Sequence, residues 1–157
     1  AGDEFTSNIE EYMRRQHNIL IGERSAERVK IEVGAAMTEI ENPPADFAVQ
    51  GRDLMSGIPK EVYISYVEIA HCLDKSISKI EEAILNALEM TPPELAADIY
   101  RKGIFMAGGG SLLRGLDKRI SMKTKLPVHV CEDPLRAVAR GTGIALKNVD
   151  KFPFLIK

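Results

Sequence analysis

The sequence predicts an α/β protein built from two parts. Residues 104–147 alternate between strand and helix patterns, which is typical of a parallel sheet covered by helices. Residues 37–65 change to a period of two, which favours an antiparallel hairpin, and helical patterns precede them. We therefore expect helices and a hairpin at residues 1–75 and an α/β part at residues 76–157.

The composition supports a folded core and limits the classes of function. The 157 residues are 45% hydrophobic and 28% charged, with a formal net charge of −2. That charge balance gives no surplus of basic residues for binding nucleic acid. No apolar run reaches the ~20 residues that a transmembrane helix needs. No signal peptide is visible in the sequence. Cys72 and Cys131 form no metal-binding spacing and the histidines are scattered, so we expect no metal site and a reduced, cytosolic setting. The start at Ala1 favours a part excised from a longer protein.

Two helices are expected before the hairpin, over residues 4–18 and from Ser25 to residue 33. Apolar residues recur in both segments at helical intervals. Ser25 is a suitable cap for the second helix because its side chain can accept from a free N–H group. Gly34 ends the second pattern.

A long helix is expected over residues 70–87, where apolar residues recur at alternating intervals of three and four. Only about three heptads are present, so an amphipathic helix across a core is favoured, with a coiled coil as the alternative. A shorter helix follows. Thr91 and Glu94 suit a capping box, Pro92 suits the first turn, and Gly103 suits the C-cap.

The α/β part is expected to contain a strand at 104–107, a glycine turn, a helix at 111–123, a strand at 127–131 and a helix at 134–147. A strand that ends in glycines and opens a helix presents bare N–H groups to an anion or nucleotide. The run from Gly108 lacks the lysine of a P-loop and the third glycine of the dinucleotide fingerprint. Tight packing of strand on helix is the alternative reason for these glycines.

Glu27 and Lys30 lie three residues apart and share a helix face beside an apolar stripe. There, a carboxylate could accept hydrogen bonds from ribose hydroxyls, and a lysine stem could pack along a base. An ordinary surface ion pair is the alternative, and it would contribute well under ~1 kcal/mol.

Six strings occur in order along the chain: AGDEF, IGERSAERVKIEVG, VQGRDLMSGIP, TPPELAADI, GIFMAGGGSLLRGLD and LPVHVCEDPLRAVARGTG. Each is weak alone, but the ordered set closely resembles the second half of the MreB family of bacterial actins over about residues 1–147. The resemblance implies the fold shared by actin, hexokinase and heat-shock ATPases. Residues 1–75 then look like the smaller outer subdomain, and residues 76–157 look like the inner α/β subdomain.

The resemblance also implies a set of nucleotide-binding residues. The superfamily's glycine turn and adenosine-contacting helix carry over to this sequence, as does the glycine near the ribose. The residues implied are Gly2, Glu27, Arg28, Lys30, Gly108, Gly109, Gly110 and Ser111, with Leu113 and Arg114 on the adenine side.

The family's two phosphate hairpins, of the DxGT and DxGGGT types, do not occur in this sequence. They hold the outer phosphates and help to position magnesium, and phosphoryl transfer depends on such positioning. The resemblance therefore implies that the full-length protein binds and hydrolyses ATP with Mg²⁺. For this chain alone we expect no catalytic residues, no ATPase activity and no bound cofactor.

Family membership further implies head-to-tail filaments of the protein itself, at the inner face of the cell membrane. The implied partners are the membrane protein RodZ and the cell-wall synthesis machinery, with membrane association indirect or through the other half. The apolar tail at residues 152–156 is expected to pack against the body, although contact with lipid or a partner is the alternative.

Two other functions stay open at this point. The chain would also suit half of a chaperone-like or sugar-kinase-like ATPase of the same superfamily, although VQGRDLMSGIP and TPPELAADI favour the MreB family. The third possibility is an assembly module that binds no nucleotide, which only the heptad-like helix supports.

Overall fold

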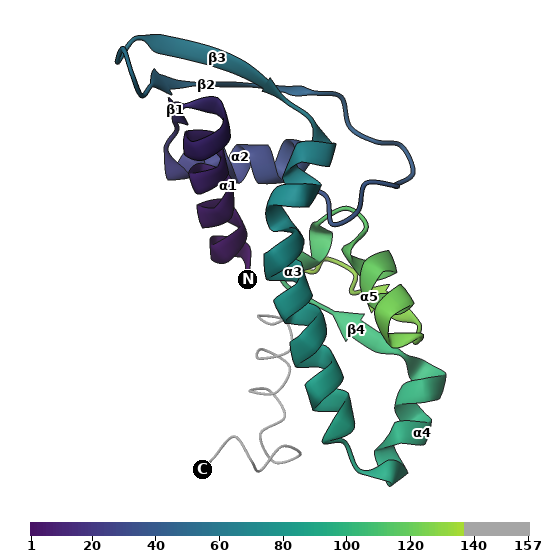
Figure 1. Cartoon of the computed structure of the whole chain (residues 1–157). Coiled ribbons are helices and arrows are strands. Elements are labelled where there is room, and N and C mark those ends of the chain that lie inside the picture. The colour runs from purple at the N-terminus through teal and green to yellow at the C-terminus, as the bar shows by residue number, and fades with distance from the viewer. Residues whose placement is uncertain (137–157) are drawn as a thin grey trace.

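The computed structural model describes residues 1–136 (Figure 1). The expected tail at 152–156 lies outside the described residues, as does most of the helix expected at 134–147; residues 134–136 form a turn. In chain order the elements are α1 (Gly2–His17), β1 (Ile19–Leu20), α2 (Glu23–Val33), β2 (Phe47–Asp53), β3 (Pro59–Ile64), α3 (Tyr66–Glu89), α4 (Pro93–Lys102), β4 (Ile104–Met106), the 3-10 helix η1 (Gly109–Leu112), α5 (Leu116–Thr124) and β5 (Val128–Val130).

The predicted antiparallel hairpin is confirmed. Strands β2 and β3 pair from Phe47 opposite Ile64 to Arg52 opposite Pro59, and residues 54–58 connect them. The sequence pattern missed β1, a two-residue strand that pairs antiparallel with the end of β2. Figure 1 shows this three-stranded sheet lying over α1 and α2.

The core lies where α1, α2 and the upper part of α3 meet under the sheet. Its largest fully buried side chains are Phe5, Ile9, Met13, Ile19, Val29, Val33, Ile64, Ile69, Leu73, Ile77 and Ile120. Most belong to the first part of the chain, and their helical spacing is the one that predicted α1 and α2.

Helix α3 is a single helix of 24 residues that runs the length of the molecule (Figure 1). It begins with a capping box in which Ser65 and Glu68 exchange side-chain and backbone hydrogen bonds. Leu73 and Ile77 are buried, whereas Ala87 at the far end of the predicted seam is exposed. The helix therefore crosses a core, as the amphipathic interpretation expected.

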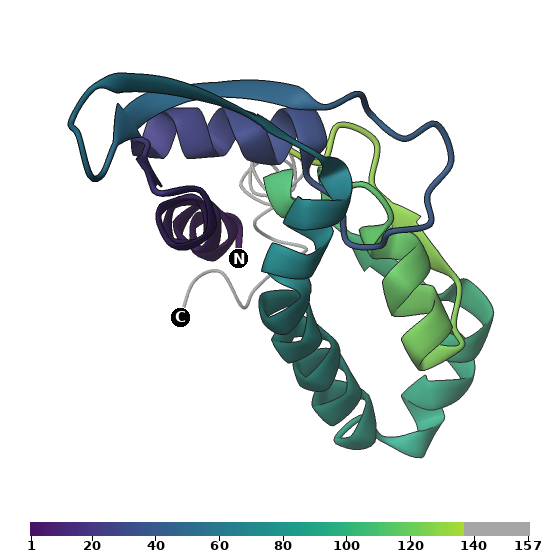
Figure 2. The same cartoon turned by 45° about the horizontal axis from the view of Figure 1, so that its top comes forward.

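Strands β4 and β5 pair in parallel, with Ile104 opposite Val128, as the alternation predicted. Helix α4 ends at Lys102, and Gly103 follows as its C-cap with a φ of 82°, which favours glycine. Figure 2 shows α4 and α5 on the side of the molecule that the loop between α2 and β2 also reaches. At that point the side chains of Met37 and Ile40 lie against Gly115.

Three of the expected helix starts are wrong. Helix α2 begins at Glu23 after an extended Gly22, so Ser25 lies inside the first turn and caps nothing. Thr91 forms no capping box, because its hydroxyl donates to the Ala87 carbonyl at the end of α3 and Pro92 is the N-cap of α4. Helix α5 begins at residue 116 rather than 111, because η1 and a Gly115 with φ of 78° intervene.

The boundary expected at residues 75 and 76 falls inside α3, which contributes to both parts of the chain. Because α3 is continuous, the division into 1–75 and 76–157 has no break in secondary structure to mark it. It stays a prediction.

A cluster of polar side chains fastens the end of α1 to the start of α3. Oε1 of Glu68 accepts from the Tyr12 hydroxyl at 3.0 Å and lies 2.9 Å from Nε2 of His17. Burial alone would raise the pKa of Glu68, but the hydrogen bonds from Ser65, His17 and Tyr12 outweigh burial and hold the pKa below its ordinary value of 4.5. Burial beside this carboxylate raises the pKa of Tyr12 to about 12.

This cluster predicts how stability depends on acid. A carboxyl whose pKa is lowered by folding stabilises the protein above the unfolded value of 4.5, and that stabilisation is lost as the pH falls through the folded pKa. Glu68→Gln should therefore be less stable than the wild type near neutral pH, and the difference should shrink below pH 4.5. Chemical denaturation of the purified wild type and variant, from neutral pH down through pH 4.5, measures the difference in stability and its dependence on pH. Glu82→Gln, at an exposed position of α3, is the control; a difference that does not change with pH would contradict the prediction.

Candidate functional site

A cavity of about 500 Å³ opens between the start of α1, one face of α2 and the segment after β4. These elements are far apart in the sequence and belong to both parts of the chain. The lining residues are Ala1, Gly2, Asp3, Phe5, Glu27, Lys30, Ile31, Gly34, Gly109, Gly110, Leu112, Leu113, Arg114 and Leu135.

Glu27 and Lys30 form the charged wall of this cavity. Nζ of Lys30 lies 2.8 Å from Oε2 of Glu27 and donates to the carbonyl of Gly2 at 3.4 Å. The Lys30 side chain is only 16% exposed, whereas that of Glu27 is 46% exposed, so the pair lies at the edge of the cavity with its lysine largely buried. Hydrogen bonds from Lys30 and from the hydroxyl of Thr6 lower the pKa of Glu27, which therefore carries its negative charge at neutral pH.

The glycine segment forms the opposite wall. Gly108 has a φ of 84°, a backbone conformation that other residues rarely adopt. Gly110 has no such backbone reason to be glycine, and a Cβ built there would meet no protein atom within 4 Å. A side chain at Gly110 would therefore occupy open space beside the cavity, which is the space a ligand would need.

Apolar side chains complete the lining, and sequence reasoning did not single out most of them. Ile31 on α2 is 61% exposed, and Leu112 and Leu135 are similarly exposed on the other side. Exposed aliphatic side chains that converge on one cavity suit a flat apolar group such as a base. Ile31 interrupts the polar residues next to Lys30, and that was the one signal in the sequence that could have found it.

Seven of the ten residues implied by the resemblance lie in this cavity: Gly2, Glu27, Lys30, Gly109, Gly110, Leu113 and Arg114. Gly108 and Ser111 line an adjoining cavity between α3 and the glycine segment, where the Ser111 hydroxyl donates to the Gly108 carbonyl. Arg28 does not line either cavity. Its guanidinium lies over the ring of Phe47, 5.4 Å from the ring centre. The guanidinium of Arg114 donates to the carbonyls of Ile31 and Gly34.

The arrangement combines a carboxylate, an ammonium group, an accessible glycine backbone and an apolar rim. Such a lining can hold a ligand that joins a flat apolar ring, hydroxyl groups and an anion. Within residues 1–136, no group of three or more His, Cys, Asp or Glu side chains could hold a metal ion. Among the same residues, no helix has the length and apolar character needed to span a membrane.

The sequence matches the family described as MreB/Mbl protein over residues 1–153. It is 41% identical over 153 residues to the cell shape-determining protein Mbl of Bacillus subtilis, covering 98% of this chain and 45% of Mbl. It is 44% identical over 150 residues to the cell shape-determining protein MreB of Escherichia coli, covering 96% of this chain and 43% of MreB. The chain thus spans less than half the length of these relatives.

Solved structures agree with this assignment. MreB5 of Spiroplasma citri bound to ADP superposes with a TM-score of 0.90 at 40% identity, over 96% of this chain and 45% of that one. The MamK double helical filament shares the fold alone, with a TM-score of 0.67 at 21% identity over 86% of this chain and 41% of that one. The described residues form an actin-like α/β domain, and the chain belongs to the MreB/Mbl family.

Proposed function

We propose that this chain supplies the adenosine side of an ATP-binding cleft in a bacterial actin of the MreB type. The observation that carries the proposal is the cavity in which Glu27 and Lys30 face Gly109 and Gly110. The related MreB5 structure was solved with ADP, and that likeness supports an adenine nucleotide as the ligand.

Each wall has a role in this proposal. The carboxylate of Glu27 is ionised and can accept hydrogen bonds from ribose hydroxyls. The aliphatic stem of Lys30 and the side chains of Ile31 and Leu113 can pack on the base. The backbone at Gly110 allows close approach of the inner phosphates, because no side chain stands there, whereas the side chain of Leu135 lies against Gly109.

We assign binding, and not hydrolysis, to the residues of this cavity. Hydrolysis of ATP with Mg²⁺ is proposed only for the full-length protein. We also propose, for the full-length protein, filaments that lie at the inner face of the cell membrane and control rod shape and cell-wall synthesis. The proposed partners of these filaments are RodZ and the cell-wall synthesis machinery.

Substitution of Gly110 tests the nucleotide site. Gly110→Val in the full-length protein should weaken ADP and ATP binding at least about tenfold, or ~1.4 kcal/mol, because the side chain enters space that the nucleotide needs. Isothermal titration calorimetry measures the dissociation constants. Gly22→Val is the matched control, since a Cβ at Gly22 also meets no protein atom within 4 Å and Gly22 lies outside the cavity.

Equal affinity in Gly110→Val and wild type would reject the site and favour an assembly module that binds no nucleotide. Nucleotide binding alone does not separate the MreB type from a chaperone-like or sugar-kinase-like ATPase. That choice rests on self-assembly, which only the MreB type requires.

We also propose that the protein assembles with itself into filaments. The tip of the β2–β3 hairpin projects from the body (Figure 1), and three apolar side chains are exposed there: Leu54, Met55 and Ile58. Clustered apolar side chains on a projecting element are typical of contacts between proteins. MamK, which shares the fold, forms a double helical filament, and that is consistent with such assembly.

The hairpin tip gives a direct test of assembly. Met55 is 88% exposed, so Met55→Lys should leave the fold intact while placing a charge at the proposed contact. In ultracentrifuge pelleting with ATP, the full-length variant should lose most of the wild-type pellet. Met122→Lys, at a methionine 65% exposed on α5, should pellet as the wild type does. A wild type that forms no polymer under any condition would overturn the MreB-type proposal.

A further inference from the structure

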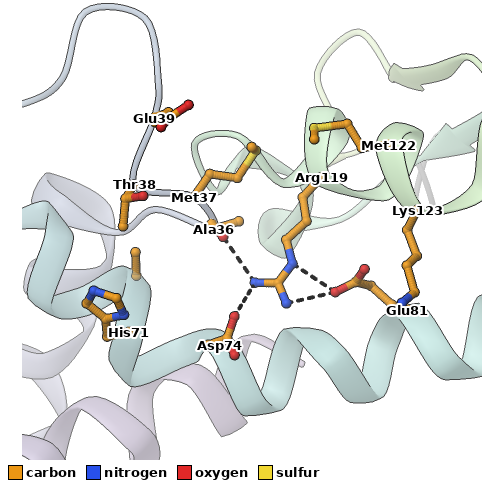
Figure 3. Close-up of a pocket in the computed structure, with 11 residues that line it drawn as sticks. Ala36, Met37, Thr38, Glu39, His71, Asp74, Glu81, Arg119, Met122 and Lys123 are labelled. Carbon is orange, nitrogen blue, oxygen red and sulfur yellow. Dashed lines mark hydrogen bonds and ion pairs between the residues drawn. The ribbon is translucent and has the colours of Figure 1, made fainter.

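A second cavity, of about 470 Å³, lies between α3, α5 and the loop that follows α2 (Figure 3). Neither the resemblance nor the proposed nucleotide site uses it. The guanidinium of Arg119 stands at its centre and points from α5 toward α3 and the loop.

Each of the three nitrogens of the Arg119 guanidinium donates a hydrogen bond of 3.1 Å or less. Nε and Nη2 contact Oε1 of Glu81 at 2.8 Å, and Nη2 also donates to the Ser78 hydroxyl. Nη1 contacts Oδ1 of Asp74 at 2.9 Å and donates to the carbonyl of Ala36 at 3.1 Å. Asp74, Ser78 and Glu81 share one face of α3, so a single side chain joins α3, α5 and the loop.

This cluster is mostly removed from water. The side chain of Arg119 is 16% exposed and that of Glu81 is 9% exposed, whereas Asp74 is 63% exposed. Breaking such a pair by removing one partner leaves a buried charge without compensation, which is costly. The loop is therefore held at Ala36 by a donor that α3 keeps in one orientation.

Ala36 connects this cluster to the nucleotide cavity. The N–H of Ala36 donates to the carbonyl of Arg114 at 2.8 Å, and Ala35 pairs with Arg114 as an isolated parallel bridge. The Arg114 guanidinium returns to α2 and donates to the carbonyls of Ile31 at 3.1 Å and Gly34 at 3.2 Å. Ile31 and Gly34 line the nucleotide cavity, while Arg119 does not.

We propose that Arg119 is a positioning residue that sets the width of the nucleotide cavity without touching the nucleotide. By fixing Ala36, it keeps the C-terminal end of α2 docked against residues 113–116, and so holds the α2 wall at its distance from the glycine wall. The inference about cavity width rests on the structure alone. Its effect on affinity rests on the proposed nucleotide site.

The test compares variants of the full-length protein by amide hydrogen exchange at residues 31–37 and by ADP affinity. Arg119→Leu should speed exchange at these residues and weaken ADP binding about tenfold, a coupling of ordinary size between linked sites. Arg119→Lys should show exchange rates and an ADP affinity between those of Arg119→Leu and the wild type. An ammonium group keeps the charge, but it cannot contact three partners as the planar guanidinium does. Arg101→Leu is the control, because Arg101 pairs only locally with Asp98 on exposed α4.

A double variant separates positioning from general stability. Arg119→Met with Glu81→Met removes both buried charges, and such replacements often preserve stability. It should keep the wild-type melting temperature yet still show faster exchange at residues 31–37 and weaker ADP binding. Wild-type exchange in the double variant would overturn the proposal. Where the wild type binds ADP, an unchanged ADP affinity in the double variant would also overturn it.

Failure of the proposed function would look different. If the wild type binds no ADP, the nucleotide site is wrong, and hydrogen exchange alone decides the role of Arg119. Faster exchange at residues 31–37 in Arg119→Leu and in the double variant then supports the docking role, and unchanged exchange overturns it.

Discussion

Residues 113–116 cross the C-terminal end of α2, and this crossing joins the two parts of the chain. The carbonyl oxygen of Lys30 is the contact that requires a glycine at Gly34, and Cδ1 of Leu113 also lies against this glycine, 2.9 Å from where a Cβ would stand. The bridge between Ala35 and Arg114 adds backbone pairing to that contact. Since Arg114 also satisfies carbonyls at the end of α2 that the helix leaves free, the same contact stabilises the helix terminus.

Helix α3 makes this crossing possible because it serves both parts at once. Its first half packs Ile69 and Leu73 into the core under the antiparallel sheet. Its second half presents Glu81, a nearly buried carboxylate, to α5. A buried charge is tolerated only when it is paired, so the position of Arg119 is fixed by the helix that carries Glu81. The position of α5 relative to α2 then follows.

The sequence predicted elements better than their ends. Apolar periodicity located α1, α2 and α3, and strand–helix alternation predicted the parallel pair of β4 and β5. Helix starts were harder, because Thr91 can cap one helix or complete another, and local sequence does not decide which. Strand β1 was missed since two residues show no period, and they are a strand only because β2 lies beside them.

The candidate site shows the same division between local and long-range information. The resemblance supplied Glu27, Lys30 and the glycines, but it could not supply the exposed rim of Ile31 and Leu135, which depends on three segments meeting. Arg114 was expected at the adenine side and lines the cavity, and its guanidinium also holds the end of α2, which the resemblance did not indicate. A cavity with one wall in each part of the chain has no fixed width of its own. Its width must come from contacts outside it, and the contacts made by Arg114 and Arg119 lie in the right place to provide it.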